Sequence, residues 1–336
     1  MAYALHPSCG LVSGKPRAAL RLVKTQGLSR DAWLQVRQGG IGSSDAAAAL
    51  GLNPYKSQLQ LWMEKTGRDA SLPKLDPTDD STPVYWGTLL EPIVATHYTR
   101  RTGYRVRRLN AVLQHPDHPW MLANIDREVV GAADVQILEC KTAGIHGARL
   151  WREGVPEYVQ LQVMHQLAVT GKHAADVAVL LGGQELQVFR IVRDEQLIAQ
   201  LIALEQEFWG YVQRDEAPPA DGSKAAEVAL RALFPQDCGA VLDWSEDSEM
   251  SGVFADLLAV RAVLAQHSQL EAQLKQRIQQ RMGQASRALF ERGEVSWKCS
   301  KEVRSLDTAR LIKDHPDLAQ RYQVSRAGSR RFVVVE

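Results

Sequence analysis

The spacing of apolar and polar residues divides the first two thirds of the chain into helices and strands. Apolar side chains at helical spacing, with capping residues at the ends, predict helices over residues 43–50, 57–66, 88–101, 155–170 and 194–212. Runs rich in β-branched and aromatic residues predict strands over residues 104–113, 121–125, 135–141, 175–181 and 186–192. The first part of the chain therefore combines helices with strands.

Turn and capping residues set the limits of several of these elements. Ser43 or Ser44 is placed to cap an alanine-rich helix, and Ser57 opens the next helix in a capping-box pattern. Residues 69–83 are rich in proline and aspartate and are expected to form a long loop. Gly182 and Gly183 lie between two strand-like runs, which predicts a β-hairpin.

Three regions are expected along the chain. Residues 1–26 lack clear periodicity and are expected to form a loose arm, while residues 27–215 form the main domain. The proline-rich segment 218–223 is the best candidate for a linker. The accessory region, residues 216–336, is expected to contain these elements: a long helix over 253–281, a hairpin over 288–298 that turns at Gly293, and a last strand over 331–335.

Composition and charge narrow the class of protein. The 336 residues are 45% hydrophobic and 24% charged, which is ordinary for a globular protein, and no apolar run approaches the length of a membrane span. The net charge is only +1, so any contact with nucleic acid must come from local basic patches. One such patch lies in this set: Arg100, Arg101, Arg105, Arg107 and Arg108.

The cysteines argue for a reducing compartment. Cys9, Cys140, Cys238 and Cys299 are far apart, so they form neither a C-x-x-C metal site nor an evident disulfide framework. The first residues lack the apolar core of a signal peptide. We therefore expect a cytoplasmic protein.

The strongest chemical signal lies near residue 139. Glu139 and Lys141 are two residues apart on a predicted strand, so their side chains emerge on one face of the sheet. Asp126 adds a second carboxylate upstream, and the backbone carbonyl of Cys140 is a third candidate oxygen ligand. Two carboxylates beside an ammonium suit Mg²⁺-assisted hydrolysis of a phosphodiester. The competing interpretation is a simple ion pair at the end of a strand.

Glu91 has two competing interpretations. Thr88-x-x-Glu91 fits a capping box, in which Glu91 only closes the N-terminus of a helix. The same carboxylate can also face a metal from a rigid helix end. Sequence spacing alone leaves both open.

Further polar residues lie on the helix that follows the Glu139 strand. Tyr158, Gln162 and His165 fall on one stripe of this helix, separate from an apolar stripe. Gln162 is a candidate to hydrogen-bond a water, Lys141 or a substrate, and the alternative is a surface glutamine. Tyr158 and His165 are weaker candidates on the same stripe.

A second candidate site lies near the N-terminus of the domain. Arg37, Ser43 and Ser44 surround a glycine-rich turn before the alanine-rich helix. Backbone N–H groups at a helix N-terminus attract anions, and a guanidinium with a hydroxyl would complete a phosphate pocket. The competing interpretation is a plain helix cap beside a surface arginine.

These motifs, in this order, resemble the YqaJ family of viral and prophage recombinases. That family is grouped with phage lambda exonuclease among the PD-(D/E)XK nucleases. The resemblance runs from about Trp33 to Tyr211. It rests on these segments: Arg37 with Gly40 to Asp45, Trp86 to Pro92, Asn124 to Asp126, Leu138 to Thr142, and Pro156 to Gly171 with Gln162 and His165 inside it.

The resemblance implies a fold, an activity and roles for individual residues. The fold is α/β (α+β), with a restriction-endonuclease-like core whose central mixed sheet is flanked by helices. The activity is Mg²⁺-dependent, with Mn²⁺ as a substitute, and degrades linear duplex DNA from 5′ to 3′ to leave single strands for recombination. Asp126 and Glu139, with the carbonyl of Cys140, would be metal ligands, while Lys141, Gln162 and Glu91 would complete the catalytic set.

The resemblance also implies partners. Arg37 and Ser44 match the residues that hold the 5′-phosphate of DNA in lambda-type exonucleases. Asp134, which precedes the Glu139 motif more closely, is an alternative to Asp126 as the first metal-binding carboxylate. Duplex DNA ends are the expected substrate, a single-strand annealing protein is an expected partner, and a trimeric ring is known in the class. The alternatives are a structure-specific endonuclease on the same fold and a non-catalytic DNA-binding or assembly module.

Overall fold

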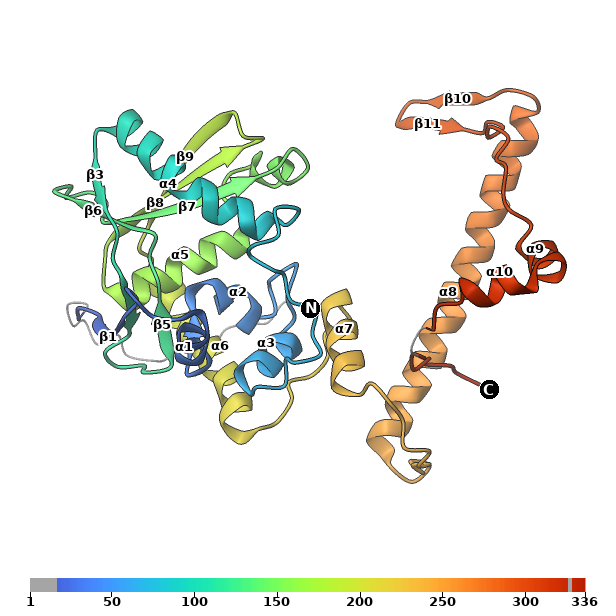
Figure 1. Cartoon of the computed structure of the whole chain (residues 1–336), viewed down its shortest axis with the longest axis horizontal. Coiled ribbons are helices and arrows are strands. Elements are labelled where there is room, and N and C mark those ends of the chain that lie inside the picture. The colour runs from blue at the N-terminus through green and yellow to red at the C-terminus, as the bar shows by residue number, and fades with distance from the viewer. Residues whose placement is uncertain (1–16, 326–327, 336) are drawn as a thin grey trace. The chain divides into compact units, whose positions relative to one another are not determined.

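The chain folds into two compact units, shown in a computed structural model that describes residues 17–325 and 328–335 (Figure 1). The first unit comprises Met1–Pro235 and the second Gln236–Glu336. The division lies later than the predicted boundary at residue 215. The reason is an unpredicted helix, α7 (Lys224–Leu233), which buries Ala226 and Ala229 and packs on α3 (Gln58–Lys65).

A five-stranded mixed sheet forms the centre of the first unit. Its order is β3-β6-β7-β8-β9, with β7 parallel to β8 and the other neighbours antiparallel. The strands are β3 (Arg105–Arg107), β6 (Arg127–Val130), β7 (Ile137–Ala143), β8 (Ala174–Leu181) and β9 (Glu185–Val192). The predicted β8–β9 hairpin is confirmed, whereas β6 was not predicted. The predicted fold class, a mixed sheet flanked by helices, is confirmed.

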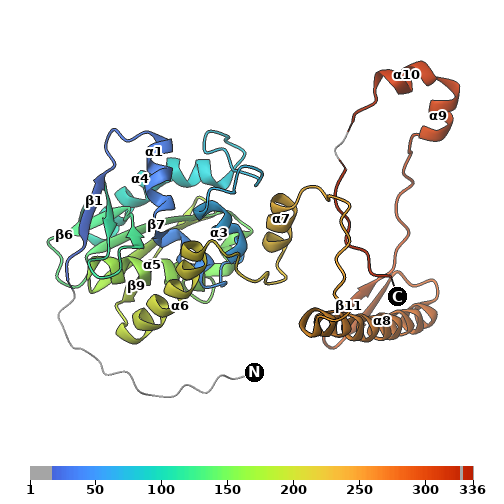
Figure 2. The same cartoon turned by 90° about the horizontal axis from the view of Figure 1, so that it is seen from below.

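Helices cover both faces of this sheet (Figures 1 and 2). Helix α4 (Pro83–Thr102) packs through Val94, Ala95 and Tyr98 on the face that carries Leu138 and Ala178. Helix α5 (Glu157–Thr170) packs on the opposite face, where Ile137 and Val177 lie. Alternation along β7 therefore turns Glu139 and Lys141, which share the parity of Ile137, toward α5.

Helix α4 begins earlier than predicted. Its N-cap is Thr82, whose hydroxyl accepts a hydrogen bond from the N–H of Tyr85, and Pro83 occupies the first turn. It ends as predicted at Gly103, which has a φ of 76°. Residues 83–87, expected to lie in a loop or just after it, therefore belong to the helix.

A smaller sheet and short helices complete the first unit. The sheet order is β1-β4-β5-β2, with these strands: β1 (Leu20–Lys24), β4 (Ala111–Gln114), β5 (Met121–Ala123) and β2 (Ile41–Gly42). The remaining helices of this unit are α1 (Arg30–Gln38), the 3-10 turn η1 (Ser43–Asp45), α2 (Ala46–Ala49), the 3-10 turn η2 (Gly147–Trp151) and α6 (Glu195–Arg214). Gly40 enters β2 where a Cβ would lie 2.5 Å from the carbonyl oxygen of Trp120, so only glycine fits. Because β1 pairs with β4, part of the predicted N-terminal arm is a strand.

The second unit is built on one long helix. Helix α8 (Ser248–Met282) is followed by the hairpin of β10 (Arg287–Phe290) and β11 (Gly293–Ser296), which confirms the predicted hairpin. Two unpredicted helices follow, α9 (Thr308–Asp314) and α10 (Pro316–Arg321). The predicted strand over 331–335 is wrong, because these residues form no regular structure. Among the helices of the described residues, none is long and apolar enough to cross a membrane.

Candidate active site

Strand pairing brings the two predicted metal ligands together. Arg127 of β6 pairs with Leu138 of β7 in antiparallel register, so the next position along each strand places Asp126 opposite Glu139. The backbone N–H of Cys140 donates to Asp126 Oδ2 at 2.8 Å and fixes that carboxylate at the strand end. The sequence-predicted pair thus lies at one place on the sheet.

Polar groups of α5 and β7 orient Glu139, whose side chain is only 4% exposed. Gln162 and Lys141 both contact its Oε1, with the ammonium at 2.7 Å. Lys141 also donates to Gln162 Oε1 at 2.9 Å. Gln166, one turn after Gln162, donates to Glu139 Oε2 at 2.7 Å and to the carbonyl of Asn124 at 3.2 Å. Four of the five predicted catalytic residues therefore form one cluster: Asp126, Glu139, Lys141 and Gln162.

Burial and the neighbouring charges shift the pKa values of Asp126 and Lys141. Burial, reinforced by the neighbouring charge of Glu139, raises the pKa of Asp126 to about 8. Burial alone would lower the pKa of Lys141, but the Glu139 carboxylate outweighs that effect and raises it. Lys141 is therefore held as an ammonium, while the two carboxylates resist being charged at the same time.

The donor set fits one hard cation rather than a closed metal cage. The side chains of the described residues include no group of three or more His, Cys, Asp and Glu suited to a metal ion. Mg²⁺ characteristically binds one or two protein carboxylates and keeps waters or substrate phosphates in its other positions. A cation between Asp126 and Glu139 would also remove the repulsion that raises the pKa of Asp126. The Oε1 atom of Gln166 is buried and has no hydrogen-bond partner among the described residues, which leaves one more oxygen free beside Glu139.

Glu91 lies beside this cluster but is not a helix cap. It sits inside α4, and Thr88, the cap predicted for it, donates its hydroxyl to the carbonyl of Val84 instead. The carboxylate pairs with Arg127 and lies 3.6 Å from Arg108. Arg127 also donates to the carbonyl of Asp126 at 2.6 Å, and thereby ties α4 to the strand end. The capping-box interpretation is wrong, because the helix begins one and a half turns earlier.

Two further candidates lie at different distances from the cluster. Tyr158 packs edge-on against Tyr55 with 5.8 Å between ring centroids, and burial raises the pKa of its hydroxyl. His165 is fully buried, with Nδ1 2.7 Å from Glu205 Oε1 and Nε2 2.9 Å from the carbonyl of Leu122. The grouping of His165 with the polar stripe is therefore corrected, because both ring nitrogens are occupied inside the core.

Asp134, the alternative to Asp126, lies elsewhere. Its carboxylate accepts from Arg190 at 2.6 Å and from the hydroxyl of Tyr104 at 2.9 Å. It is exposed and has no contact with Glu139. The alignment through Asn124 to Asp126 is the one that the strand register supports.

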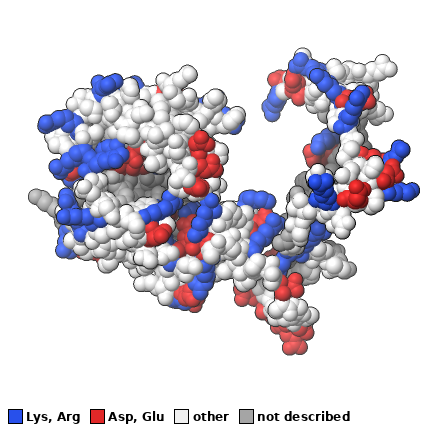
Figure 3. All heavy atoms as spheres, in the orientation of Figure 1, with Lys and Arg blue, Asp and Glu red and all other residues white. Residues whose placement is uncertain are grey.

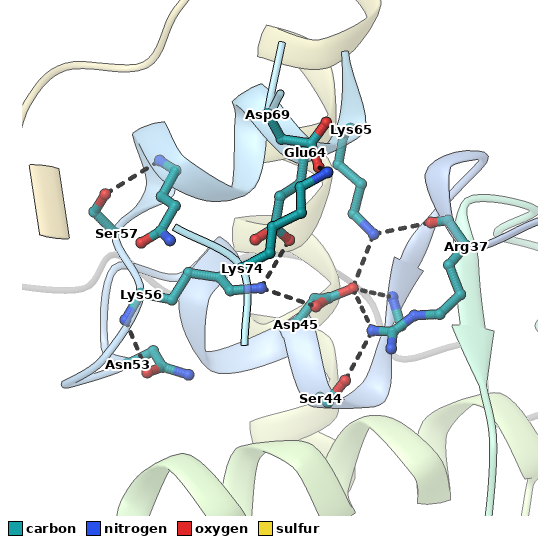
Figure 4. A network of polar contacts seen from close by, with 12 residues as sticks. Arg37, Ser44, Asp45, Asn53, Lys56, Ser57, Glu64, Lys65, Asp69 and Lys74 are labelled. Atoms are coloured by element: carbon teal, nitrogen blue, oxygen red, sulfur yellow. Dashed lines mark hydrogen bonds and ion pairs between the residues drawn. The ribbon is translucent and has the colours of Figure 1, made fainter. Parts of the chain in front are cut away.

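Two of the three predicted phosphate-binding residues, Arg37 and Ser44, lie beside a buried aspartate, Asp45 (Figure 4). Arg37 Nη2 donates to Ser44 Oγ at 2.8 Å and to Asp45 Oδ2 at 2.9 Å. Lys65 donates to the same Asp45 oxygen at 2.8 Å, and Lys56 lies 3.9 Å from the other. Burial alone would raise the pKa of Asp45, but Arg37 and the two lysines hold it well below its usual range.

This cluster is open to solvent at one end. Ser44 is exposed and Arg37 is 23% exposed, whereas Lys65 is only 4% exposed. Ser43 is buried, and its hydroxyl lacks a hydrogen-bond partner among the described residues. Neither serine caps α2 as predicted, since its N-cap position is Asp45. An anion could approach Arg37 and Ser44 from solvent while the buried cations add to the field.

The arginine run forms an exposed basic edge on the first unit. Its members lie at the end of α4 and along and after β3, and they are exposed: Arg100, Arg101, Arg105, Arg107 and Arg108. Figure 3 shows Lys and Arg side chains gathered on the left side of the first unit, where β3 and β6 lie in Figure 1. Through Arg108 this edge reaches Glu91, and therefore borders the carboxylate cluster.

Five residues of these clusters were not found from the sequence. Gln166 follows Gln162 by one helical turn, a spacing that could have indicated it. Arg127 directly follows Asp126, and Asp45 directly follows the predicted phosphate residues. Lys56 and Lys65 gave no signal, because their contacts with Asp45 depend on how α3 and its surroundings pack on α1 and α2.

Comparisons with known proteins find a matching family model and a similar bacterial protein. Residues 32–173 match the family model of the YqaJ-like viral recombinase domain. The protein YqaJ of Bacillus subtilis (strain 168), described as uncharacterized, is 34% identical over 320 residues, which cover 94% of this chain and 97% of that protein.

Solved structures show a weaker likeness. An alkaline exonuclease (LHK-Exo) from Laribacter hongkongensis matches with a TM-score of 0.46 and 21% identity, over 55% of this chain and 93% of that one. A phage related exonuclease from Haemophilus somnus 129PT matches with a TM-score of 0.37 and 10% identity, over 55% of this chain and 99% of that one.

Proposed function

Because the chain belongs to the family of the YqaJ-like viral recombinase domain, we propose that its first unit is a metal-dependent deoxyribonuclease. The proposed reaction is hydrolysis of one strand of linear duplex DNA, from a 5′ end toward the 3′ end. The observation that carries the proposal is the cluster of Asp126, Glu139, Lys141 and Gln162 on one end of β6 and β7.

Each side chain of the cluster has a role that its contacts support. A Mg²⁺ or Mn²⁺ ion held by Asp126 and Glu139, with the Cys140 carbonyl as predicted third oxygen, would lower the pKa of a bound water and neutralise phosphate charge. Lys141, held as an ammonium, attracts the scissile phosphate and the attacking oxygen. Gln162 fixes Lys141 and Glu139 relative to each other, and Gln166 holds the far oxygen of Glu139.

The second cluster supports a start at DNA ends. Arg37 and Ser44 present a guanidinium and a hydroxyl at an exposed position, with Lys65 and Lys56 behind them. A terminal 5′-phosphate is a small dianion that suits such donors. The exposed arginine edge from Arg100 to Arg108 would hold the backbone of the duplex without reading its sequence.

The test is digestion of end-labelled linear duplex DNA with Mg²⁺ or with EDTA. We expect Mg²⁺-dependent release of nucleotides from the 5′ strand, and a loss of at least about a hundredfold in Lys141→Ala. The matched control is Lys224→Ala, which removes an exposed lysine of α7. Equal rates for the wild type and Lys141→Ala would overturn the assignment.

Two alternatives give different results in the same assay. Cleavage of covalently closed circular DNA would indicate a structure-specific endonuclease. Absence of cleavage together with absence of heat on titration with Mg²⁺ or Mn²⁺ would indicate a non-catalytic DNA-binding or assembly module.

The proposal extends to partners of the reaction. Single strands left by the nuclease are the substrate of a single-strand annealing protein, so we propose such a protein as its partner in recombination. A trimeric ring of the first unit, as in the resembled class, would let the duplex pass through while one strand is digested. Co-purification of the annealing protein tests the first point, and sedimentation of a chain that ends at Pro235, which lacks α8, tests the second.

A further inference from the structure

Helix α8 is long, and the described residues of the second unit leave most of it uncovered. It contains 35 residues, a length of about 52 Å at 1.5 Å per residue, and none of them is buried. Figure 2 shows α9 and α10 away from α8, with the β10–β11 hairpin near only one part of it. Isolated helices gain most of their stability from packing of an apolar face, so a helix of this kind requires a cover.

The apolar residues of α8 follow a heptad pattern. The first core position of each heptad is occupied by Met250, Leu257, Leu264, Glu271 and Ile278, and the second by Val253, Val260, His267, Leu274 and Arg281. Val253, Val260, Leu264 and Leu274 are each at least half exposed. Such spacing is typical of a helix that packs along its length against another helix.

Charge is distributed unequally along the same region. The segment before and within the first part of α8 is acidic: Asp237, Asp243, Glu246, Asp247, Glu249 and Asp256. The last part of α8 and the start of β10 are basic: Lys275, Arg277, Arg281 and Arg287. Among the described residues, Asp256, Arg277 and Arg281 make no ion pair. The two ends of this helix are therefore complementary to each other but too far apart to meet within one helix.

We propose that α8 pairs with α8 of a second copy of this chain as an antiparallel coiled coil. In the register that centres the pair between Ala265 and Gln266, Leu257 meets Leu274 of the second copy. Val253 meets Ile278 and Leu264 meets His267 in the same way. Flanking the core, Asp256 lies opposite Arg277, so the acidic end of each helix faces the basic end of the other.

The parallel arrangement fits the sequence less well. It would place Glu271 against Glu271 and Arg281 against Arg281 in the core, and like charges there are unfavourable. In the antiparallel register each of these residues lies opposite an apolar one, Val260 or Met250. The flanking positions then also bring Val263 against Leu270, which are 51% exposed in the single chain.

A groove beside the last turns of α8 can receive the acidic end of α8 from the second copy. It lies between the last turns of the helix and β10 and is lined by apolar and basic residues, among them Leu274, Arg277, Ile278, Arg281, Arg287 and Phe290. The antiparallel register brings the acidic first turns of the second copy to this groove. Apolar and charge complementarity thus point to the same occupant.

Cysteine pairs in the full chain test the orientation of the two helices. Val253→Cys and Ile278→Cys are made in a background with the exposed Cys238 and Cys299 replaced by serine. Chains with either cysteine alone are co-expressed and mildly oxidised. We expect a disulfide between the two different chains and little between identical ones, because Val253 of one copy lies about 37 Å from Val253 of the other.

Other outcomes of this experiment overturn the proposal. A disulfide between two Val253→Cys chains would show a parallel pair. Absence of any cross-link above that of the background chain would show that something else covers α8, such as another part of the same chain or a different protein.

Charge exchange gives a second, independent measurement. We expect Asp256→Arg to weaken self-association by about tenfold in sedimentation equilibrium, because it places two arginines together at two symmetric positions. Adding Arg277→Asp to Asp256→Arg should restore self-association. The control Gln276→Glu changes charge on the outward face of α8 and should leave self-association unchanged. Failure of the double variant to recover would contradict the register. Neither measurement depends on nuclease activity.

Discussion

At the scale of single residues, the candidate site depends on how Glu139 is held. Its carboxylate accepts from Gln162 and Gln166, one turn apart on α5, and pairs with Lys141 on its own strand. All three contacts lie on the face of the sheet opposite α4, so α5 and β7 together fix the position of the Glu139 carboxylate. Asp126 is held separately, by the backbone of Cys140.

Gln166 is predicted to be a positioning residue for Glu139. Gln166→Leu removes the donor to Glu139 Oε2 and should lower the rate of Mg²⁺-dependent digestion by about 10- to 100-fold, with a weaker apparent affinity for Mg²⁺. The control is Gln160→Ala, which removes an exposed glutamine of the same helix. Digestion rates over a Mg²⁺ series measure both effects. An unchanged Mg²⁺ dependence in Gln166→Leu would remove Gln166 from the site.

His165 is predicted to stabilise the fold as an imidazolium. Both of its partners, Glu205 Oε1 and the carbonyl of Leu122, are acceptors, so both ring nitrogens must carry hydrogen. Burial alone would lower the pKa of His165, but the Glu205 carboxylate outweighs it and raises the pKa above 6.5. The stabilisation is therefore complete below pH 6.5 and is lost as pH rises through the pKa of the folded state.

Denaturant unfolding between pH 6 and pH 10 checks this prediction. Relative to His165→Leu, which leaves Glu205 buried and unpaired, the wild type should be more stable by about 3 kcal/mol at pH 6, and the difference should shrink at alkaline pH. A difference that is constant over the whole range would show that His165 does not titrate in the folded state.

At the scale of elements, the sequence predicted those with a strong local signal. The hairpin at Gly182-Gly183, the cap at Ser57 and the end of α4 at Gly103 all depend on turn or cap residues, and all three are confirmed. Strand β6 was missed because its four residues show no run of β-branched side chains long enough to identify it. The predicted strand over 331–335 is apolar but has no neighbour to pair with in the described structure.

In the candidate site too, the residues with a local sequence signal could be predicted and the contacts between elements could not. Glu139, Lys141 and Asp126 could be predicted because strand alternation and motif order are local properties. The Glu91–Arg127 pair and the Asp45 cluster could not, since they depend on how α4 meets β6 and how α3 meets α1. Contacts between elements are set by packing, which leaves little trace in the spacing of residues.

The turn between α1 and α2 is predicted to select DNA ends that carry a 5′-phosphate. Arg37→Ala and Ser44→Ala should bring the rates on 5′-phosphorylated and 5′-hydroxyl ends close together, because they remove the exposed donors. Arg30→Ala, an exposed arginine of the same helix, is the control. Competition between the two substrates in one reaction measures the ratio. An equal loss of rate on both ends would show a general DNA contact instead.

Asp45 is predicted to support the same turn rather than to bind DNA. Asp45→Asn leaves Lys65 and Arg37 without their carboxylate, and should lower the free energy of unfolding by about 3 kcal/mol at pH 7. Since the pKa of Asp45 is held below 3.8, its contribution is present above pH 3.8 and is lost as pH falls through the pKa of the folded state. Chemical unfolding at pH 7 and at low pH measures the difference, which should narrow in acid.

At the scale of the whole molecule, the chain separates the proposed chemistry from the proposed pairing surface. The carboxylate cluster and the phosphate turn lie in the first unit, and α8 lies in the second. The division follows α7, whose buried Ala229 joins the core formed by α3, α6 and their neighbours. The first unit should therefore contain all residues needed for cleavage.

Two truncations distinguish the observed boundary from the one expected from the sequence. A chain that ends at Pro235 should keep the Mg²⁺-dependent rate of the full protein to within a few-fold, because it retains α7. A chain that ends at Asp215 should be less stable by about 2–3 kcal/mol, since loss of α7 exposes apolar residues of α3 such as Trp62. Thermal unfolding and digestion of both chains check this. Equal stability of the two would place the end of the folded unit at residue 215 and make α7 part of a linker.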